Sequence, residues 1–330
     1  MKNGNAAKGK EKGFLSGKLK NSTFSSYSGL ALVLIVFCIF LSIRNPNFMT
    51  VNNILNVLRQ VSVYGILSAG MAFVIISGGI DLSVGAVAGI AGAIVAKCIT
   101  QDWMPFVPIV ILSILLGGLI GLCNGTLISR TGIPPFVMTL GMQTSLRGLC
   151  YIICEGRPIG NLPNYFQDIG LGATLGIPTP IYFMVAIFII AGVILNKTPF
   201  GRSIYAVGGN PTAAFNAGIN SKRVLTSAYT ISGLFAALAG ILLAARNASA
   251  QPTGGQAFET EAIAACAMGG ISMAGGYGSI VGVILGTLIL GVINNGMNLL
   301  YINSYWQLVV KGVIIAGSVI YSMYNAKRGE

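Results

Sequence analysis

Long uninterrupted runs of apolar residues are the feature of this sequence that most limits its fold. Hydrophobic residues fill 54% of the 330 positions and charged residues only 8%, whereas globular proteins carry about 25% charged residues. A run of about 20 apolar residues is long enough to cross a bilayer as a helix. The sequence therefore predicts an all-α polytopic membrane protein and excludes a pair of soluble domains.

About ten such segments divide the chain, and we expect them to form the transmembrane helices of one compact, glycine-rich bundle over residues 27–325. A basic tail, residues 1–26, precedes the bundle and is predicted to be disordered, and a short tail, 326–330, follows it. The second segment begins with an amphipathic stretch, and the eighth is short and rich in glycine. The expected spans are Tyr27–Ile43, Val51–Ser77, Leu82–Ile99, Pro105–Ile128, Pro135–Cys154, Thr179–Asn196, Val224–Ala245, Ala262–Gly275, Ser279–Leu300 and Trp306–Tyr324.

Positive charge is concentrated in some of the connecting segments. Six lysines lie in the first 20 residues, and the loop 197–223 carries four more Lys and Arg residues. Cationic loops stay in the cytoplasm, so we expect both termini and the loop 197–223 at the cytoplasmic face. This concentration of positive charge on the cytoplasmic side explains the net charge of +12. We therefore expect the chain to contact lipid and not to bind nucleic acid. The acids expected on the outer side are Asp102, Glu155, Asp168 and Glu259.

The residue types that most enzymes depend on are scarce in this chain. The sequence has no histidine and eight acids, which excludes Ser-His-Asp hydrolysis and histidine-ligated metals. Residues 4–10 match the G-x4-G-K pattern of a phosphate-binding loop, but Glu11 stands where the magnesium-binding Ser or Thr is required. We therefore expect no catalytic residue, no metal site and no cofactor bound by this chain.

The chain has 45 glycines, and several of them recur within the apolar runs at a spacing of four residues. Such stripes let helix backbones approach closely in lipid, and we expect close helix crossings there. The stripes are Gly117, Gly121 and Gly125, then Gly85 and Gly89, then Gly282 and Gly286.

Two glycine-rich segments, Ser77–Gly85 and Met268–Gly276, interrupt apolar runs. Interrupted helices in transporters line cavities, because their free backbone groups need polar partners. Asp81 lies in the first break. It is predicted either to cap the N-terminus of the third span or to take part in gating.

The loop 197–223 contains signals for a short helix. Asn210 is a good N-cap, Pro211 suits the first helical position, and Gly218 is a helix stop. The sequence predicts a helix over Pro211–Ala217, which is either a docking element or a solvated turn.

These motifs resemble those of the permease subunits of bacterial ATP-binding-cassette sugar importers of the ribose type. The resemblance spreads from about Pro46 to Lys311, and the family usually carries aspartate where this chain has Glu261. The matching stretches are Ser77–Gly85, Phe200–Asn220, Ser249–Pro252, Ala262–Gly276 and Trp306–Lys311.

The resemblance implies a pore made by two copies of the chain in the bacterial inner membrane. It implies that a separate ATP-binding subunit uses ATP and magnesium, and that a periplasmic or lipid-anchored protein delivers a ribose-like monosaccharide. This chain would then be no enzyme, and its cytoplasmic loop would be the coupling helix that docks on the ATPase. The coupling residues would be Gly208, Gly209, Asn210, Pro211, Ala213, Ala214, Ala217, Gly218 and Ile219.

A neutral sugar needs hydroxyl and amide partners along its path, and acids in the spans are candidates for gating. Each such residue could instead make a hydrogen bond between helices. The candidates are Asp81, Ser83, Asn124, Thr139, Gln143, Glu261, Asn294, Asn295 and Asn298.

Two other functions stay open on the sequence. The chain could act alone as a secondary transporter or channel for a small neutral solute, although the few embedded acids disfavour proton coupling. It could also be a membrane-embedded enzyme, but we find no catalytic cluster.

Overall fold

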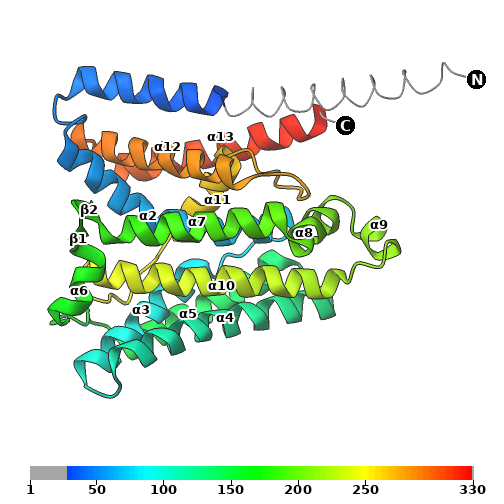
Figure 1. Ribbon diagram of the computed structural model, residues 1–330, viewed down its shortest axis with the longest axis horizontal. Coiled ribbons are helices and arrows are strands. Elements are labelled where there is room, and N and C mark those ends of the chain that lie inside the picture. Colours follow the sequence, from blue (N-terminus) through cyan, green and yellow to red (C-terminus); the bar gives the residue numbers. More distant parts are fainter. Residues whose placement is uncertain (1–27, 329–330) are drawn as a thin grey trace, which may run out of the picture.

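The computed structural model describes residues 28–328, and these residues are almost entirely helical (Figure 1). After a first helix, Ser28–Arg44, the elements are α2 (Val51–Ile76), α3 (Val84–Thr100), α4 (Phe106–Thr131), α5 (Pro135–Ile153), α6 (Asn164–Leu171), β1 (Ala173–Thr174), β2 (Ile177–Pro178), α7 (Thr179–Lys197), α8 (Pro199–Gly209), α9 (Pro211–Asn216), α10 (Ser221–Arg246), α11 (Phe258–Met268), α12 (Ile280–Leu299) and α13 (Ser304–Arg328).

The expected all-α membrane bundle is confirmed. Each expected span corresponds to a helix, and the amphipathic stretch continues into the apolar run as the single helix α2. Five helices, α2, α4, α7, α10 and α12, are long and apolar enough to cross a membrane, and three shorter apolar helices accompany them. The predicted tail, residues 1–26, lies outside the described residues.

The eighth expected span differs from the sequence-based bounds. Helix α11 begins at Phe258, four residues before the expected start, and ends at Met268 after 11 residues. It ends there because Gly269 and Gly270 follow, and Gly270 adopts a left-handed φ of 79°, which glycine tolerates and other residues rarely adopt. The chain then runs irregularly to Ser279, the N-cap of α12.

The polar stretch between α5 and α7 contains structure that the sequence did not indicate. Helix α6 buries Phe166 completely, with its ring 6.0 Å from that of Phe106 on α4. The strands β1 and β2 form a minimal antiparallel hairpin that leads directly into α7.

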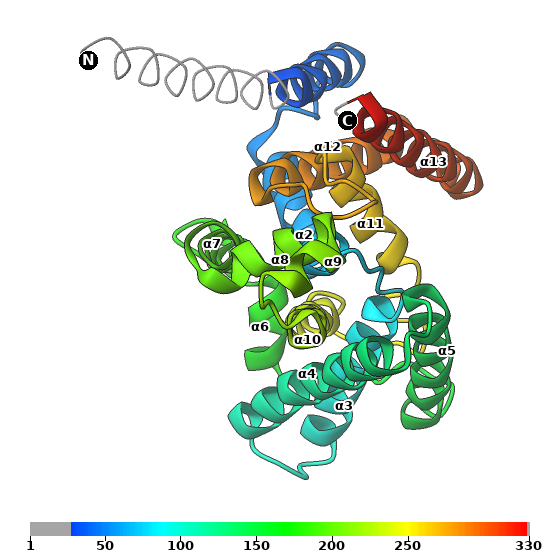
Figure 2. The same cartoon turned by 90° about the vertical axis from the view of Figure 1, so that its right-hand side faces the viewer.

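Helices α2 and α10 form the centre of the bundle, and Figure 2 shows α10 surrounded by other helices. In their most apolar windows, 83% of α2 and 78% of α10 are buried, against 28% of α4 and 33% of α7. A helix that is apolar on all sides must be buried in protein or lie against lipid. The exposed apolar faces of α4 and α7 therefore belong to the perimeter of the chain.

The predicted glycine stripes are confirmed as close helix contacts. On α4, a Cβ atom at Gly117 or Gly121 would collide with the backbone of α10. The glycine pair on α3 lies against the loop before α11, and the pair on α12 lies against the end of α11. From α10, Gly240 contacts the backbone of Ala88 on α3, so the central helix is held by glycine on two of its sides.

The contact at Gly240 gives a direct test of this packing. Gly240→Ala places a methyl group against the rigid backbone of Ala88, and overpacking of this kind costs about 1–3 kcal/mol. The thermal unfolding midpoint of the purified protein, followed by circular dichroism in detergent, should fall. Gly192→Ala on α7 is the control, because its Cβ would meet no described atom within 4 Å. Equal midpoints for the two variants would contradict the packing argument.

Candidate functional site

The loop 197–223 folds into two consecutive helices, α8 and α9. The predicted helix is confirmed, because Asn210 Oδ1 accepts a hydrogen bond from the Ala213 amide at 2.9 Å and Pro211 is the first helical residue. The helix ends at Asn216, one residue before the expected end; Ala217 is its C-cap, and Gly218 follows with a φ of 80°. Helix α8 was not predicted; its N-cap is Thr198, whose Oγ1 accepts from the Gly201 amide at 3.0 Å.

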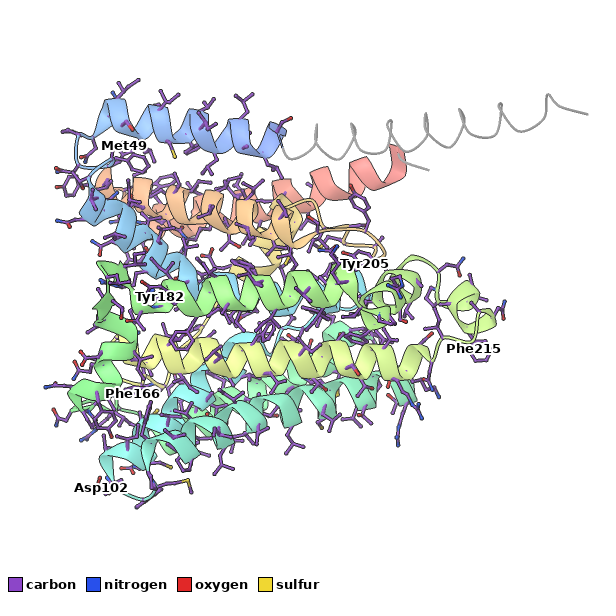
Figure 3. All side chains as sticks on the ribbon, in the orientation of Figure 1. Met49, Asp102, Phe166, Tyr182, Tyr205 and Phe215 are labelled. Carbon is purple, nitrogen blue, oxygen red and sulfur yellow. The ribbon has the colours of Figure 1, made fainter. Side chains whose placement is uncertain are left out.

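Helix α9 projects from one end of the molecule beyond the neighbouring helices (Figure 1). Its Phe215 side chain is 73% exposed and lies at that end (Figure 3). Ala214, on the other side of the helix, is buried. The sequence analysis did not single out Phe215, although it is the one aromatic residue between Tyr205 and Tyr229 in a loop of small and polar residues.

Three glycine-rich segments meet where α8 ends. The Gly276 amide donates to the Ile76 carbonyl at 2.8 Å, which joins the second helix break to the end of α2. A Cβ atom at Gly208 would collide with both of these backbone groups. We name this contact the glycine junction and define it by Gly78, Gly208, Gly209, Gly275 and Gly276.

The free backbone groups of the two helix breaks are satisfied by protein partners around this junction. The Tyr229 hydroxyl donates to the Ile80 carbonyl at 3.1 Å, and the Tyr205 hydroxyl donates to the Gly278 carbonyl at 2.9 Å. Both breaks are therefore packed against the helices that lead into and out of α9. Only Asn210 separates α9 from the junction.

Asp81 is buried and bonded at the first break. Its Oδ1 accepts from the Ser83 amide at 2.9 Å and from the Ser83 hydroxyl at 2.6 Å, and its Oδ2 accepts from the Ser232 hydroxyl at 3.2 Å. Asn124 Nδ2 donates to Ser83 Oγ at 3.0 Å. Three predicted residues thus join the start of α3 to α4 and α10. Ser83 is the N-cap of α3, and Asp81, two residues earlier, accepts from the amide of that N-cap residue. Ser232 was missed because the sequence does not show that α10 faces the break.

A second polar contact lies between α5 and α11. Gln143 Nε2 donates to Glu259 Oε1 at 2.9 Å, and Arg147 Nη1 donates to the carbonyls of Pro252 at 3.1 Å and Gly254 at 2.7 Å. The sequence analysis expected Glu259 on the outer side of the membrane, at the edge of a loop, and the structure places it in the first turn of α11. The side chain is 7% exposed, because α11 starts one residue earlier and carries it into the bundle.

Glu261 forms an ion pair with Lys311 that joins α11 to α13. Lys311 Nζ lies 2.7 Å from Glu261 Oε1, and the two side chains are 27% and 9% exposed. The glutamate that stands where the family usually has aspartate therefore reaches its basic partner.

The remaining predicted path residues are distributed over other parts of the helix bundle. Asn295 exchanges amide hydrogen bonds with Asn53 on α2 at 2.9 and 3.0 Å, and Gln307 on α13 donates to Asn298 Oδ1 at 3.0 Å. Thr139 donates to the Pro135 carbonyl at 2.9 Å, and Asn294 is buried on α12. Most of the residues predicted for the sugar path thus make hydrogen bonds between helices, which the sequence analysis gave as the alternative to a sugar contact.

A different set of residues forms a small, polar exposed face on α5. Gly141, Thr144, Ser145 and Gly148 recur at spacings of three and four residues and are all exposed. A Cβ at either glycine would meet no described atom within 4 Å. The spacing of these residues was a signal in the sequence, but only the structure shows that this face points away from the chain.

At the opposite end of the molecule from α9, Lys97 Nζ lies 2.6 Å from Glu155 Oε1. This hydrogen bond and the lysine charge hold the pKa of the Glu155 carboxyl below its usual value. Within residues 28–328, no three His, Cys, Asp or Glu side chains lie close enough to hold a metal ion.

The described residues form a glycine-packed bundle of apolar helices from which the short helix α9 projects, as in a polytopic membrane protein. The chain belongs to the family of branched-chain amino acid transport system permease components, which matches residues 53–319.

Curated relatives cover nearly the whole chain. It is 48% identical over 298 residues to the ribose import permease protein RbsC of Bacillus subtilis (strain 168), covering 88% of this chain and 91% of the relative. It is 38% identical to the D-allose transport system permease protein AlsC of Escherichia coli (strain K12), covering 90% and 91%. It is 40% identical to the L-arabinose transport system permease protein AraH of the same strain, covering 91% of each. No solved structure matches the chain.

Two adjacent glycines test the junction. In Gly208→Ala the new methyl group would collide with the backbone of Ile76 and Gly276, whereas in Gly209→Ala it would lie 3.8 Å from the nearest atom, Gly276 Cα. We expect Gly208→Ala to lower the free energy of unfolding by about 1–3 kcal/mol and Gly209→Ala to leave it nearly unchanged. Thermal unfolding in detergent measures the stability of both variants. If Gly208→Ala were as stable as the wild type, the backbone contact at the junction would not be close.

The Glu261–Lys311 ion pair gives a second stability test. Lys311→Met leaves the Glu261 carboxylate without its partner, and we expect a loss of about 3 kcal/mol, as for other broken buried pairs. Adding Glu261→Gln to this variant should restore most of the lost stability. Lys97→Met is the control and should cost less than about 1 kcal/mol, because the Glu155 side chain is 76% exposed. Similar losses for Lys97→Met and Lys311→Met would contradict this difference.

Proposed function

We propose that this chain is the pore-forming permease subunit of an ATP-driven importer that carries a monosaccharide across the bacterial inner membrane. The family match and the ribose, D-allose and L-arabinose permeases among its relatives support this class of substrate. The ribose import permease of Bacillus subtilis is 48% identical, so a ribose-like pentose is the substrate we propose. The chain binds no nucleotide in this proposal, and a separate ATP-binding subunit uses ATP and magnesium.

The observation that carries the proposal is the exposed Phe215 on a capped helix that is joined to the glycine junction. A phenyl ring that is 73% exposed at the end of a polar loop is suited to a hydrophobic cleft on a partner, where aromatic anchors supply much of the binding energy. The charge bias supports a cytoplasmic position for α9 and both termini, where the ATPase would bind. Movement of α9 would then act on both helix breaks through Gly208.

We propose that the sugar passes along the exposed face of α5 and that a second copy of the chain closes the path. The hydroxyls of Thr144 and Ser145 can exchange hydrogen bonds with sugar hydroxyls, and Gly141 and Gly148 leave room beside them. In Figure 2, α5 and α13 lie on the same side of the molecule, so both are available to a second copy. A periplasmic or lipid-anchored sugar-binding protein would deliver the sugar at the opposite end from α9.

The test is ATP-dependent uptake of radiolabelled ribose into liposomes that contain the permease, with its ATPase and binding protein. Phe215→Ala should weaken binding of the ATPase by about 30-fold, the equivalent of a 2 kcal/mol anchor residue, and should abolish uptake at limiting ATPase. Trp103→Ala is the control, because Trp103 is 66% exposed and follows Asp102, which lies at the opposite end from Phe215 (Figure 3).

Two outcomes would overturn the proposal. Normal ATPase binding and uptake by Phe215→Ala would show that α9 is not the docking element. Ribose uptake by the wild-type chain alone, without ATPase or ATP, would show a stand-alone transporter or channel.

A further inference from the structure

An apolar groove runs along α7 on the side of the molecule away from α5. The groove has a volume of about 550 Å³ and lies between α7, α2 and α12. Figure 2 shows α7 at the edge of the bundle, opposite α5, so the groove is separate from the proposed sugar path.

The lining of the groove is apolar along its length and becomes basic at one end. On α7 the lining extends from Ile181 to Lys197 and includes Phe188 and Val193, and Ile284 of α12 faces them. Sixteen residue steps of helix are about 24 Å long, which is most of a hydrocarbon core of about 30 Å. Of the lining residues, Lys197 alone carries a charge, and it lies in the last turn of α7.

More positive charge lies immediately beyond this end. Helix α8 begins at Pro199, so the partial positive charge of its N-terminus follows Lys197 closely. Arg202 is exposed in the first turns of α8. The end of the groove therefore combines an apolar slot for a hydrocarbon chain with positive charge at the level of the lipid headgroups.

We propose that this groove binds an anionic phospholipid, with one acyl chain along α7 and the phosphate at Lys197. The lipid belongs to the cytoplasmic leaflet, and this point rests on the orientation proposed above. Basic pockets between membrane helices on the cytoplasmic side bind acidic headgroups in this way. A second copy of the chain is a poorer occupant, because an apolar helix face would offer no anion to Lys197.

The lipid site is tested with the full-length protein in liposomes of phosphatidylethanolamine that contain phosphatidylglycerol with a diazirine in one acyl chain. After illumination, peptide mapping should place the label on α7 and α12 around Phe188, Val193 and Ile284. Lys197→Ala should reduce this labelling about fivefold, because each basic residue near the membrane surface contributes about 1 kcal/mol to binding an anionic lipid. Lys222→Ala is the control for charge, since Lys222 is exposed at the start of α10 and does not line the groove.

A second variant tests the groove without altering charge. Gly192 lines the groove, and a Cβ there would meet no described atom within 4 Å, so Gly192→Leu should fold normally while filling the slot and reducing the labelling. Gly317→Leu on α13 is its control, because its Cβ also meets no described atom within 4 Å.

Three results would overturn the proposal: equal labelling in Lys197→Ala and wild type, equal labelling by phosphatidylcholine with the same diazirine chain, or a disulfide between copies of a Val193→Cys variant in place of labelling. These readouts do not depend on sugar transport, so the lipid site and the proposed function fail or stand separately.

Discussion

Close contact between helix backbones is the constraint on which the rest of this structure depends. Lipid tails are as apolar as the side chains, so the hydrophobic effect does not hold helices together within a bilayer. Van der Waals contact and hydrogen bonds must replace it, and both require short distances. In this chain the glycines on α4 contact the backbone of α10, and Gly240 contacts that of Ala88. The central helix α10 is therefore held by surfaces that leave no room for a Cβ atom.

The same kind of contact connects the two helix breaks to the projecting helix. At the glycine junction, the Gly276 amide bonds to the Ile76 carbonyl, and Gly208 is packed against both groups. A single region thus joins the ends of α2 and α8 to the start of α12, next to the helix that reaches out of the bundle.

Polar residues within the spans serve mainly to join helices. Asp81, Ser83 and Asn124 form one bonded group, and Glu261 pairs with Lys311. Their residue types were sufficient to mark them as unusual in a membrane, but the same types suit a sugar path and an interhelical bond equally well. Their partners, Ser232 for Asp81 and Lys311 for Glu261, lie 151 and 50 residues away in the chain, and one sequence without its fold cannot pair them. The burial of Glu259 was not evident for the same reason, since it depends on where α11 begins.

The sequence by itself determined the long apolar helices, the stripes of close packing and the short capped helix at Asn210, but not helices α6 and α8. These features depend on local chemistry: apolar runs, residues spaced by one helical turn, and a side chain that bonds an amide three residues on. The tertiary structure decided which faces are covered. It buried α2 and α10, exposed the small polar face of α5 and the ring of Phe215, opened the groove beside Lys197, and brought two distant glycine breaks into contact. Such outcomes depend on packing between segments far apart in the chain, and no local pattern encodes them.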